Sequence, residues 1–225
     1  GLAHPFGTDL LGRDLLARTL YGTRISLAVG LGVAFAATIA GTAIGMIAGY
    51  ARILDGVLMR GIDGLMAIPP VLLAVTLMTV MRGSLVNVIA AIALAELPRV
   101  ARLVRASVQA VRANLYVQAA IVAGARTPAI LLRHILPNIA AVIVVQATFI
   151  GASAILLEAV LSFIGAGIPP TTPSWGNIMA EGRSLWQVKP HILVFPAIFL
   201  SLTVLGVNLV GDGLRNRLDP RGKAS

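Results

Sequence analysis

The feature that most constrains the fold is an uninterrupted run of residues without charge, residues 25–50. As a helix, these 26 residues extend about 39 Å at 1.5 Å per residue, which exceeds a bilayer core of about 30 Å. We therefore expect a transmembrane helix. Gly41, Gly45 and Gly49 recur at every fourth position, so one face of this helix is predicted to pack closely against another helix.

Four further apolar segments predict more spans: residues 66–81, 85–97, 139–168 and 192–210. The first contains Pro69-Pro70 and is expected to begin as a broken or kinked helix, and Pro196 is expected to interrupt the last. The helix that contains residues 85–97 is predicted to continue past Pro98, beyond its apolar part. Charged residues make up 12% of the chain, against roughly 25% in soluble domains. The sequence thus predicts an all-α membrane protein with five transmembrane helices.

The loops between these spans are predicted at residues 52–63, a charged segment, and at 169–190, which is rich in Pro, Gly and Trp. Trp175 and Trp186 in the second loop are typical of a membrane interface. Gly83, flanked by Arg82 and Ser84, is expected to turn the chain between the second and third spans.

Composition excludes several functions. A net charge of +9 in a soluble protein would indicate nucleic acid, but here the basic residues lie in short loops between apolar segments, so no nucleic-acid partner is expected. The chain has no cysteine, and its three histidines are far apart, so no metal or thiol site is predicted. No phosphate-binding glycine loop or other catalytic motif occurs. The chain is therefore expected to be no enzyme and to hold no cofactor.

One polar stretch, residues 112–138, is predicted to form two short helices between two apolar segments. Asn114 is placed to cap the first helix, over 115–123. Gly124 supplies a turn residue that tolerates positive φ. Thr127-Pro128 is a start signal for a second helix, which is expected to end near His134 before Pro137 breaks or kinks the chain.

The first of these helices is expected to present Leu115, Ala119 and Val122 on one face. The small side chains of Ala119 and Ala120 allow another protein to approach closely. We interpret this stretch as a contact with a soluble partner. The alternative is an ordinary loop between two spans.

The same stretch resembles a known motif. Gln118-Ala119-Ala120, Gly124 and His134-Ile135-Leu136-Pro137, separated by three and nine residues, resemble the EAA motif of permease subunits of ABC importers. In that family the motif forms a cytoplasmic coupling helix that sits in a groove of the ATPase. The resemblance implies ATPase docking by six residues: Gln118, Ala119, Ala120, Gly124, Leu136 and Pro137. The family usually has Glu first, so the charge at Gln118 is missing while the length and acceptor oxygen remain.

Other stretches are similar to the dipeptide, oligopeptide and nickel branch of these permeases, as its C-type subunit. They are Gly7-Thr8-Asp9 with Gly12-Arg13-Asp14, the run from Arg133 to Asn138, the run from Glu158 to Gly165, Pro173 to Asn177 with Glu181-Gly182-Arg183, and Gly211 to Arg215 with Leu218 to Arg221. The resemblance implies one permease domain over residues 1–225 with the type I ABC importer fold. Residues 1–24 are expected to be an interfacial segment, or a polar linker, and we expect the helix that precedes this segment in the branch to be absent from the sequence as given.

Two acidic residues lie inside predicted spans, where a carboxylate is a functional candidate. Glu96 is expected to form an ion pair with Arg99 or Arg102, or else to face an aqueous cavity and serve transport. Glu158 is expected to serve a gate or packing rather than to recognise substrate directly, because its surroundings resemble a branch that carries several substrates.

The basic residues also predict an orientation. With the 112–138 loop in the cytoplasm, five spans place the N-terminus of this chain outside and the C-terminus inside. Twelve of the 18 Lys and Arg residues then lie inside and six outside, which agrees with the positive-inside rule. The expected location is the inner membrane of a bacterium.

The resemblance implies that this chain is one of two different permease subunits, which form a heterodimer and enclose a pathway for peptides or a related small solute. ATPase subunits holding ATP and magnesium, and an external substrate-binding protein, would be its partners. A rival hypothesis is a secondary transporter that uses Glu96 or Glu158 as proton carriers, although its expected inverted repeat is not found. A third is a membrane scaffold that transports nothing.

Overall fold

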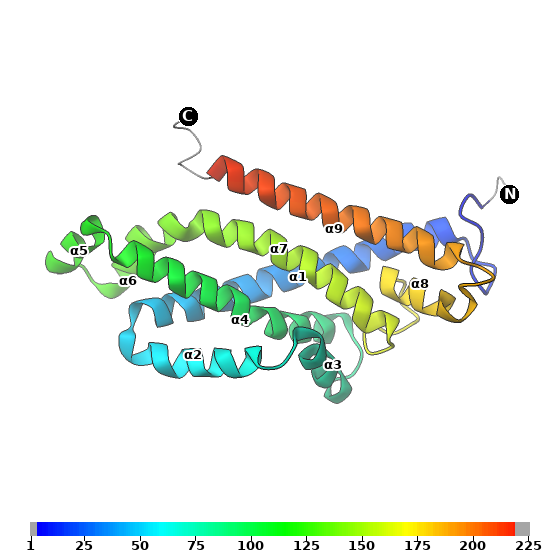
Figure 1. Ribbon diagram of the computed structural model, residues 1–225, viewed down its shortest axis with the longest axis horizontal. Helices are drawn as coiled ribbons and strands as arrows, with labels where there is room; N and C mark the ends of the chain where they lie inside the picture. Colours follow the sequence, from blue (N-terminus) through cyan, green and yellow to red (C-terminus); the bar gives the residue numbers. More distant parts are fainter. Residues whose placement is uncertain (1–3, 219–225) are drawn as a thin grey trace.

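The computed structural model describes residues 4–218. Over this range the protein is built from helices, and its only β pairing is an isolated bridge between Thr8 and Asp14. Four long helices run along the long axis of the molecule (Figure 1). They are α1 (Leu15–Tyr50), α4 (Leu85–Arg112), α7 (Leu136–Phe163) and α9 (His191–Leu218). Helices α1, α4 and α7 pack against one another, and α9 packs on α7.

The glycine face of α1 packs directly on α4, as predicted. A Cβ atom on Gly45 would lie 2.6 Å from the backbone oxygen of Ala101, and one on Gly49 would lie 2.9 Å from the backbone oxygen of Arg105. A Cβ atom on Gly41 would lie 2.6 Å from the side chain of Val100. At these positions only the hydrogen atom of a glycine fits between the two helices. The glycines therefore allow α1 and α4 to approach this closely.

The prediction of a charged loop at residues 52–63 is wrong. This segment is helix α2 (Arg52–Met66), and it buries Met59 and Ile62. Its carboxylates are paired with α4: Asp55 contacts Arg105 at 2.5 Å and Asp63 contacts Arg102 at 2.7 Å. The charges therefore lie on a helix whose other positions are apolar, and they do not mark a break.

Helix α2 turns by 87° into α3 (Pro70–Val80), with Pro69 at the break. The expected broken helix near Pro69-Pro70 is thus present. Within residues 4–218, three helical segments are long and apolar enough to cross a membrane, and there are four if the bent pair counts as one span. Those three are Leu15–Tyr50, Thr127–Phe163 and His191–Leu218. The prediction of five spans is not confirmed on this basis, because α4 carries several charged residues in its second half.

The region 169–190 contains more structure than the expected loop. It includes helix α8 (Trp175–Gly182) and a short 3₁₀ helix η2 (Arg183–Leu185). Trp175 is fully buried, and its indole N–H donates to the carbonyl oxygen of Thr19 at 3.0 Å, so its predicted place at a membrane interface is wrong. Trp186 is 59% exposed.

Helix α9 continues through Pro196, which was expected to interrupt it. The proline lies in the second turn of the helix, so it removes one backbone hydrogen bond near the helix start, where the loss is small. The helix also extends into the predicted polar tail and reaches Leu218. The remaining residues of that tail motif, Asp219 to Arg221, lie outside the described residues.

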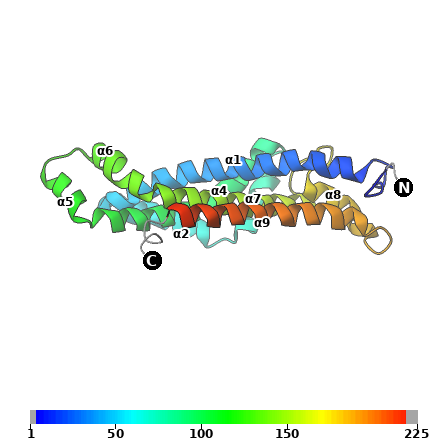
Figure 2. The ribbon, with the colours of Figure 1, turned by 90° about the horizontal axis from the view of Figure 1, so that it is seen from above.

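The two ends of the bundle are different. The N-terminal segment and α8 lie at one end, and the segment between α4 and α7 projects from the other (Figures 1 and 2). Helix α9 runs back from the α8 end, so its C-terminal end lies in the half of the bundle that carries the projecting segment (Figure 2).

Candidate functional site

The projecting segment is the polar stretch 112–138, and it forms a helix, a turn and a second helix. Its parts are α5 (Leu115–Val122), α6 (Thr127–Ala129) and a π-helical turn η1 (Ile130–Ile135). Gly124 has φ of 79°, in the region that favours glycine, and a Cβ atom there would meet nothing within 4 Å. The predicted two helices and the turn at Gly124 are confirmed.

The second helix does not end near His134 as expected. It continues through the π turn into α7, and Pro137 lies in the first turn of α7. The wider turn accommodates the missing N–H of the proline: Leu136 N donates to Leu131 O, one residue further back than in an α-helix. The side-chain amide of Asn138 also donates to His134 O at 2.6 Å. Of the predicted break or kink at Pro137, the break is absent, and the structure has a π bulge within a continuous helix.

Helix α5 turns an apolar face away from the bundle. Val117 is completely buried and anchors the helix, whereas Leu115 is 87% exposed and Val122 is 88% exposed. Ala119, which shares their face, is also exposed. No residue of α5 is charged. A surface helix normally exposes its polar side, so this outward apolar face has the character of a contact surface.

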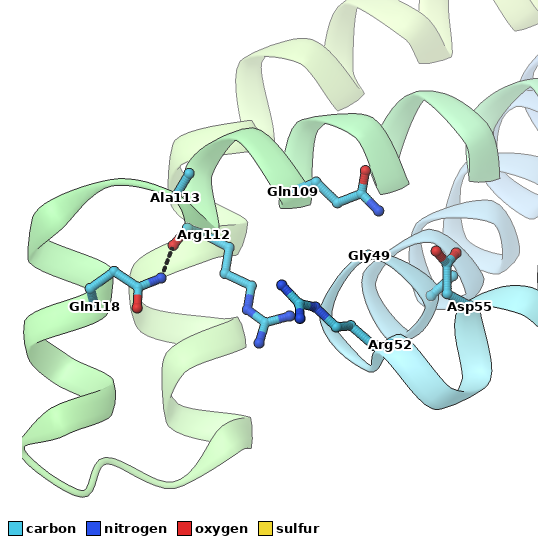
Figure 3. A pocket seen from close by; sticks show the side chains of 8 residues that line it. Gly49, Arg52, Asp55, Gln109, Arg112, Ala113 and Gln118 are labelled. Atoms are coloured by element: carbon cyan, nitrogen blue, oxygen red, sulfur yellow. Dashed lines mark hydrogen bonds between the residues drawn. The ribbon is translucent and has the colours of Figure 1, made fainter.

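Gln118 connects α5 to the preceding long helix. Its side-chain amide donates to the carbonyl oxygen of Arg112 at 2.8 Å, at the end of α4 (Figure 3). An ionised glutamate has no donor for this bond, so glutamine has a local role here that the usual residue of the motif cannot fill. Asn114 occupies the N-cap position, as predicted, but its side chain makes no capping hydrogen bond.

The structure does not gather all six predicted docking residues on one surface. Ala119 lies on the exposed face of α5, and Ala120 beside it is half-buried. Leu136 packs against the main core, and Pro137 lines a separate cavity between α4, α7 and α9. These last two residues shape the connection to α7 instead of extending the apolar face.

Glu96 lies at the interface of α4 and α7 and is 1% exposed. One carboxylate oxygen accepts a hydrogen bond from the Ser153 hydroxyl at 2.8 Å. The other is 3.0 Å from a guanidinium nitrogen of Arg99, one turn along α4, although that contact lacks hydrogen-bond geometry. The predicted ion pair with Arg99 is present, and it links two long helices.

Glu158 is fully buried where α7, α1 and the start of α8 meet. It accepts hydrogen bonds from Ser162 at 2.8 Å and from Ser26 of α1 at 3.3 Å. Trp175 N, at the start of α8, contacts the same Ser26 hydroxyl at 3.5 Å. Hydroxyl groups from α1 and from α7 itself thus contact this carboxyl group, an arrangement that favours a packing role.

Sequence reasoning missed a cluster of charges at the opposite end of the bundle. The guanidinium of Arg18 in α1 contacts Asp9 at 2.7 Å and Glu181 of α8 at 2.5 Å. Arg13 contacts the same two carboxylates at 2.6 and 3.2 Å. The motifs that contain Asp9, Arg13 and Glu181 were recognised separately, but Arg18 stands 163 positions from Glu181 and outside both motifs. Only its spacing of three from buried Leu15 hinted at a packed position.

The cluster gives a pH prediction. Burial raises the pKa of the Asp9 carboxyl, but hydrogen bonds from Arg13 and Leu11 outweigh burial, so the pKa lies below its ordinary value of 3.8. Because the folded pKa is lowered, this contribution to stability is complete above the unfolded value and is lost as the pH falls through the folded one. The protection of residues 8–14 against hydrogen exchange, taken relative to the intrinsic amide rate at each pH, should therefore persist at neutral and mildly acidic pH and decrease only below pH ~4. A loss of protection already near pH ~6 would contradict this assignment.

The apolar bundle, with three helical segments in residues 4–218 that are long and apolar enough to span a bilayer, defines a multi-pass membrane protein. Comparison with known proteins identifies its family. A family model described as "binding-protein-dependent transport system inner membrane component" matches residues 41–223. The chain belongs to this family.

Curated relatives agree with the family. The chain is 51% identical to a probable peptide ABC transporter permease of Sinorhizobium fredii, over 97% of this chain and 75% of the relative. It is 41% identical to a dipeptide transport system permease of Alkalihalophilus pseudofirmus, over 98% and 73%. It is 42% identical to a glutathione transport system permease of Pectobacterium atrosepticum, over 99% and 74%.

Solved structures show the same fold. A structure described as inward-facing conformations of the MetNI methionine ABC transporter superposes with a TM-score of 0.76 at 19% identity, covering 91% of this chain and 96% of that one. An amino acid ABC transporter gives a TM-score of 0.61 at 16% identity, covering 91% and 99%. The fold is therefore that of ABC importer permeases.

These findings establish the chain as the membrane permease subunit of an ATP-driven ABC transporter, for which ATP hydrolysis belongs to separate subunits. They contradict the rival hypothesis of a secondary transporter driven by an ion gradient. Glu96 and Glu158 are then not required as proton carriers, which agrees with their contacts to serine and arginine side chains.

Proposed function

We propose that this permease forms half of a pathway for peptides or a related small solute and is driven by an ATPase that docks on α5. The observation that carries the docking proposal is the exposed apolar face of α5, with Leu115 and Val122 almost fully exposed at the tip of the bundle. Apolar side chains in such a position gain free energy only when a partner removes them from water.

The proposed orientation places α5 in the cytoplasm and the N-terminal segment outside. The excess of basic residues on the side of α5 supports it. In this arrangement the C-terminal end of α9 lies on the cytoplasmic side, because α9 ends in the same half of the bundle as α5 (Figure 2). The α2–α3 pair and α4 complete five spans, although α4 is too charged to qualify by composition alone.

The contacts of α5 suggest how movement of an ATPase reaches the spans. Gln118 and buried Val117 hold α5 against the bundle, and the helix after Gly124 runs into α7 without a break. A displacement of α5 therefore acts on α4 and α7 together. Glu96 links these two helices through Ser153, so they are expected to move as a unit during alternating access.

The substrate class rests on the relatives, which are named for peptides, dipeptides and glutathione. We propose a solute of this kind, delivered by an external binding protein and enclosed by a second, different permease subunit. The exposed apolar side chains of the long helices, such as Leu31 and Phe35 of α1 at 71% exposure, would face that subunit or lipid. Identifying the solute that the partner binding protein retains tests the substrate class.

A pull-down of the ATPase tests the docking surface. Ala119→Trp places a large side chain in the middle of the exposed face and should reduce ATPase recovery at least about fivefold, since overpacking costs ~1–3 kcal/mol. Gln118→Ala removes one hydrogen bond within the chain, at a cost of ~0.5–1.5 kcal/mol, and should reduce recovery only mildly. Ala110→Trp on α4, also an exposed alanine, is the control for bulk and should behave as the unmutated protein.

Recovery is measured at matched expression and at two salt concentrations. Because the face is apolar and uncharged, recovery should depend little on salt. Normal recovery with Ala119→Trp, together with loss in Gln118→Ala, would show that the polar contact and not the apolar face holds the ATPase.

A further inference from the structure

A cavity of about 550 Å³ lies beside the projecting segment 112–138, between the ends of α1 and α4 and the starts of α2 and α5 (Figure 3). Its lining includes Gly49, Arg52, Asp55, Gln109, Arg112 and Gln118. Small-molecule sites typically have volumes of roughly 300–1,000 Å³, so this space is large enough for a polar headgroup. No role assigned above uses it.

The charges around the cavity do not cancel. Asp55 is engaged by Arg105 through two hydrogen bonds, at 2.5 and 2.6 Å. Within residues 4–218, neither Arg52 nor Arg112 forms an ion pair with a carboxylate. The cavity therefore holds two guanidinium groups whose charge is not balanced by neighbouring acids.

Arg112 is held in place for binding. One of its terminal nitrogens donates to the carbonyl oxygen of Tyr50 at 2.6 Å, and the guanidinium lies 4.7 Å from the centre of the Tyr50 ring. These contacts use one of five donors and leave the others available. Figure 3 shows the Arg52 and Arg112 side chains reaching toward each other. Two like charges so arranged are stabilised when an anion lies between them.

We propose that this cavity binds the phosphate headgroup of an anionic phospholipid from the leaflet next to the projecting segment. Guanidinium groups bind phosphate through paired hydrogen bonds, and the amides of Gln109 and Gln118 can donate to its other oxygens. Basic pockets between transmembrane helices on the cytoplasmic side bind lipid headgroups in the same way. This inference rests on the proposed orientation, which places the cavity at the cytoplasmic surface.

A lipid fits the surroundings better than free phosphate does. Next to Arg52, helix α2 exposes an apolar strip: Ile53 is 92% exposed and Val57 is 68% exposed. Acyl chains attached to a bound headgroup would cover this apolar strip, whereas inorganic phosphate would leave it exposed to water. The headgroup would also connect α2 with α4 beside the attachment point of α5.

Native mass spectrometry tests the proposal. The permease is purified in mild detergent with its co-purifying subunits and incubated with mixed micelles of phosphatidylglycerol and phosphatidylcholine. We expect retention of phosphatidylglycerol in preference to phosphatidylcholine. Arg52→Gln should lower that retention about fivefold, the equivalent of ~1 kcal/mol for one cation near an anionic membrane. Arg52→Lys should keep most of it. Arg60→Gln, an exposed arginine of the same helix outside the cavity, is the matched control and should not change it.

Arg112→Gln is a second variant. Because it also removes the contact with Tyr50, the Arg52 variants provide the decisive measurement. Equal retention by Arg52→Gln and the unmutated protein would overturn the proposal. So would displacement of phosphatidylglycerol by inorganic phosphate at equal concentration, which would make free phosphate the ligand. Normal lipid retention with loss of the ATPase in Arg52→Gln would identify a protein contact instead. If no ATPase co-purifies with the unmutated protein, the proposed function fails, while the lipid measurement can still be read.

Discussion

Replacing Gly45 with leucine is expected to abolish accumulation of folded permease in the membrane. A Cβ atom at this position would lie 2.6 Å from a backbone oxygen and 2.7 Å from the side chain of Val104, both on α4. The backbone of α4 cannot move aside locally, so the two helices would have to separate along their whole contact. Overpacking typically costs ~1–3 kcal/mol, and the larger values apply where backbone is struck.

Glycines of α2 provide the control for this experiment. A Cβ atom on Gly61 would meet nothing within 4 Å. Gly61→Ala should therefore be neutral or stabilising, by up to ~1 kcal/mol of helix propensity, whereas Gly45→Ala should destabilise. Thermal unfolding in detergent, followed by size-exclusion chromatography, measures both. Equal melting temperatures for Gly45→Ala and Gly61→Ala would refute the close packing of α1 on α4.

Arg18→Met is the second change with a large expected effect. The side chain of Asp9 is completely buried and that of Arg18 is 10% exposed, so the substitution leaves this buried acid and the partly exposed Glu181 with one cation fewer. Breaking a buried ion pair in this way costs ~3–5 kcal/mol, and the lower figure is expected here because Arg13 continues to contact both carboxylates. The N-terminal segment should then detach from α8.

Hydrogen exchange of residues 8–14 and of α8 measures this detachment. Arg24→Met is the matched control, because Arg24 lies on the same helix, exposed, with its guanidinium 5.5 Å from the Tyr21 ring. That variant should leave exchange unchanged, and Arg18→Lys should restore part of the protection by keeping the charge. Slow exchange in Arg18→Met, as in the unmutated protein, would show that the charges do not hold the segment in place. The stacking of Phe6 on Phe195, whose ring centroids lie 3.9 Å apart, would then be the main contact that holds the N-terminal segment.

The features predicted correctly from sequence are those fixed by local chemistry. The absence of charge over residues 25–50 is sufficient for a long helix, and glycines at every fourth position are sufficient for a packing face. Positive φ at Gly124 follows from a glycine between two helical patterns. The outward face of α5 follows from the spacing of Leu115, Ala119 and Val122.

The features that were missed depend on residues far apart in sequence. The charges of α2 indicated a loop because their partners, Arg102 and Arg105, lie on another helix. Trp175 was assigned to the membrane surface because nothing in its own segment shows the carbonyl of Thr19 that accepts its N–H. Likewise, Asp9 and Glu181 were noticed as separate motifs, and only the folded chain places Arg18 between them.

The π turn at Ile130–Ile135 also determines how the segment before it is rotated about the axis of α7. A π bulge is equivalent to one residue inserted into an α-helix, and one residue corresponds to a rotation of about 100° around the axis. The turn therefore sets the direction in which α5 points relative to the faces of α7. A lineage that lost one residue between 130 and 135 would retain an unbroken helix while its α5 pointed in another direction. Aligned relatives of this chain should accordingly vary more readily in side chain than in length across these six positions.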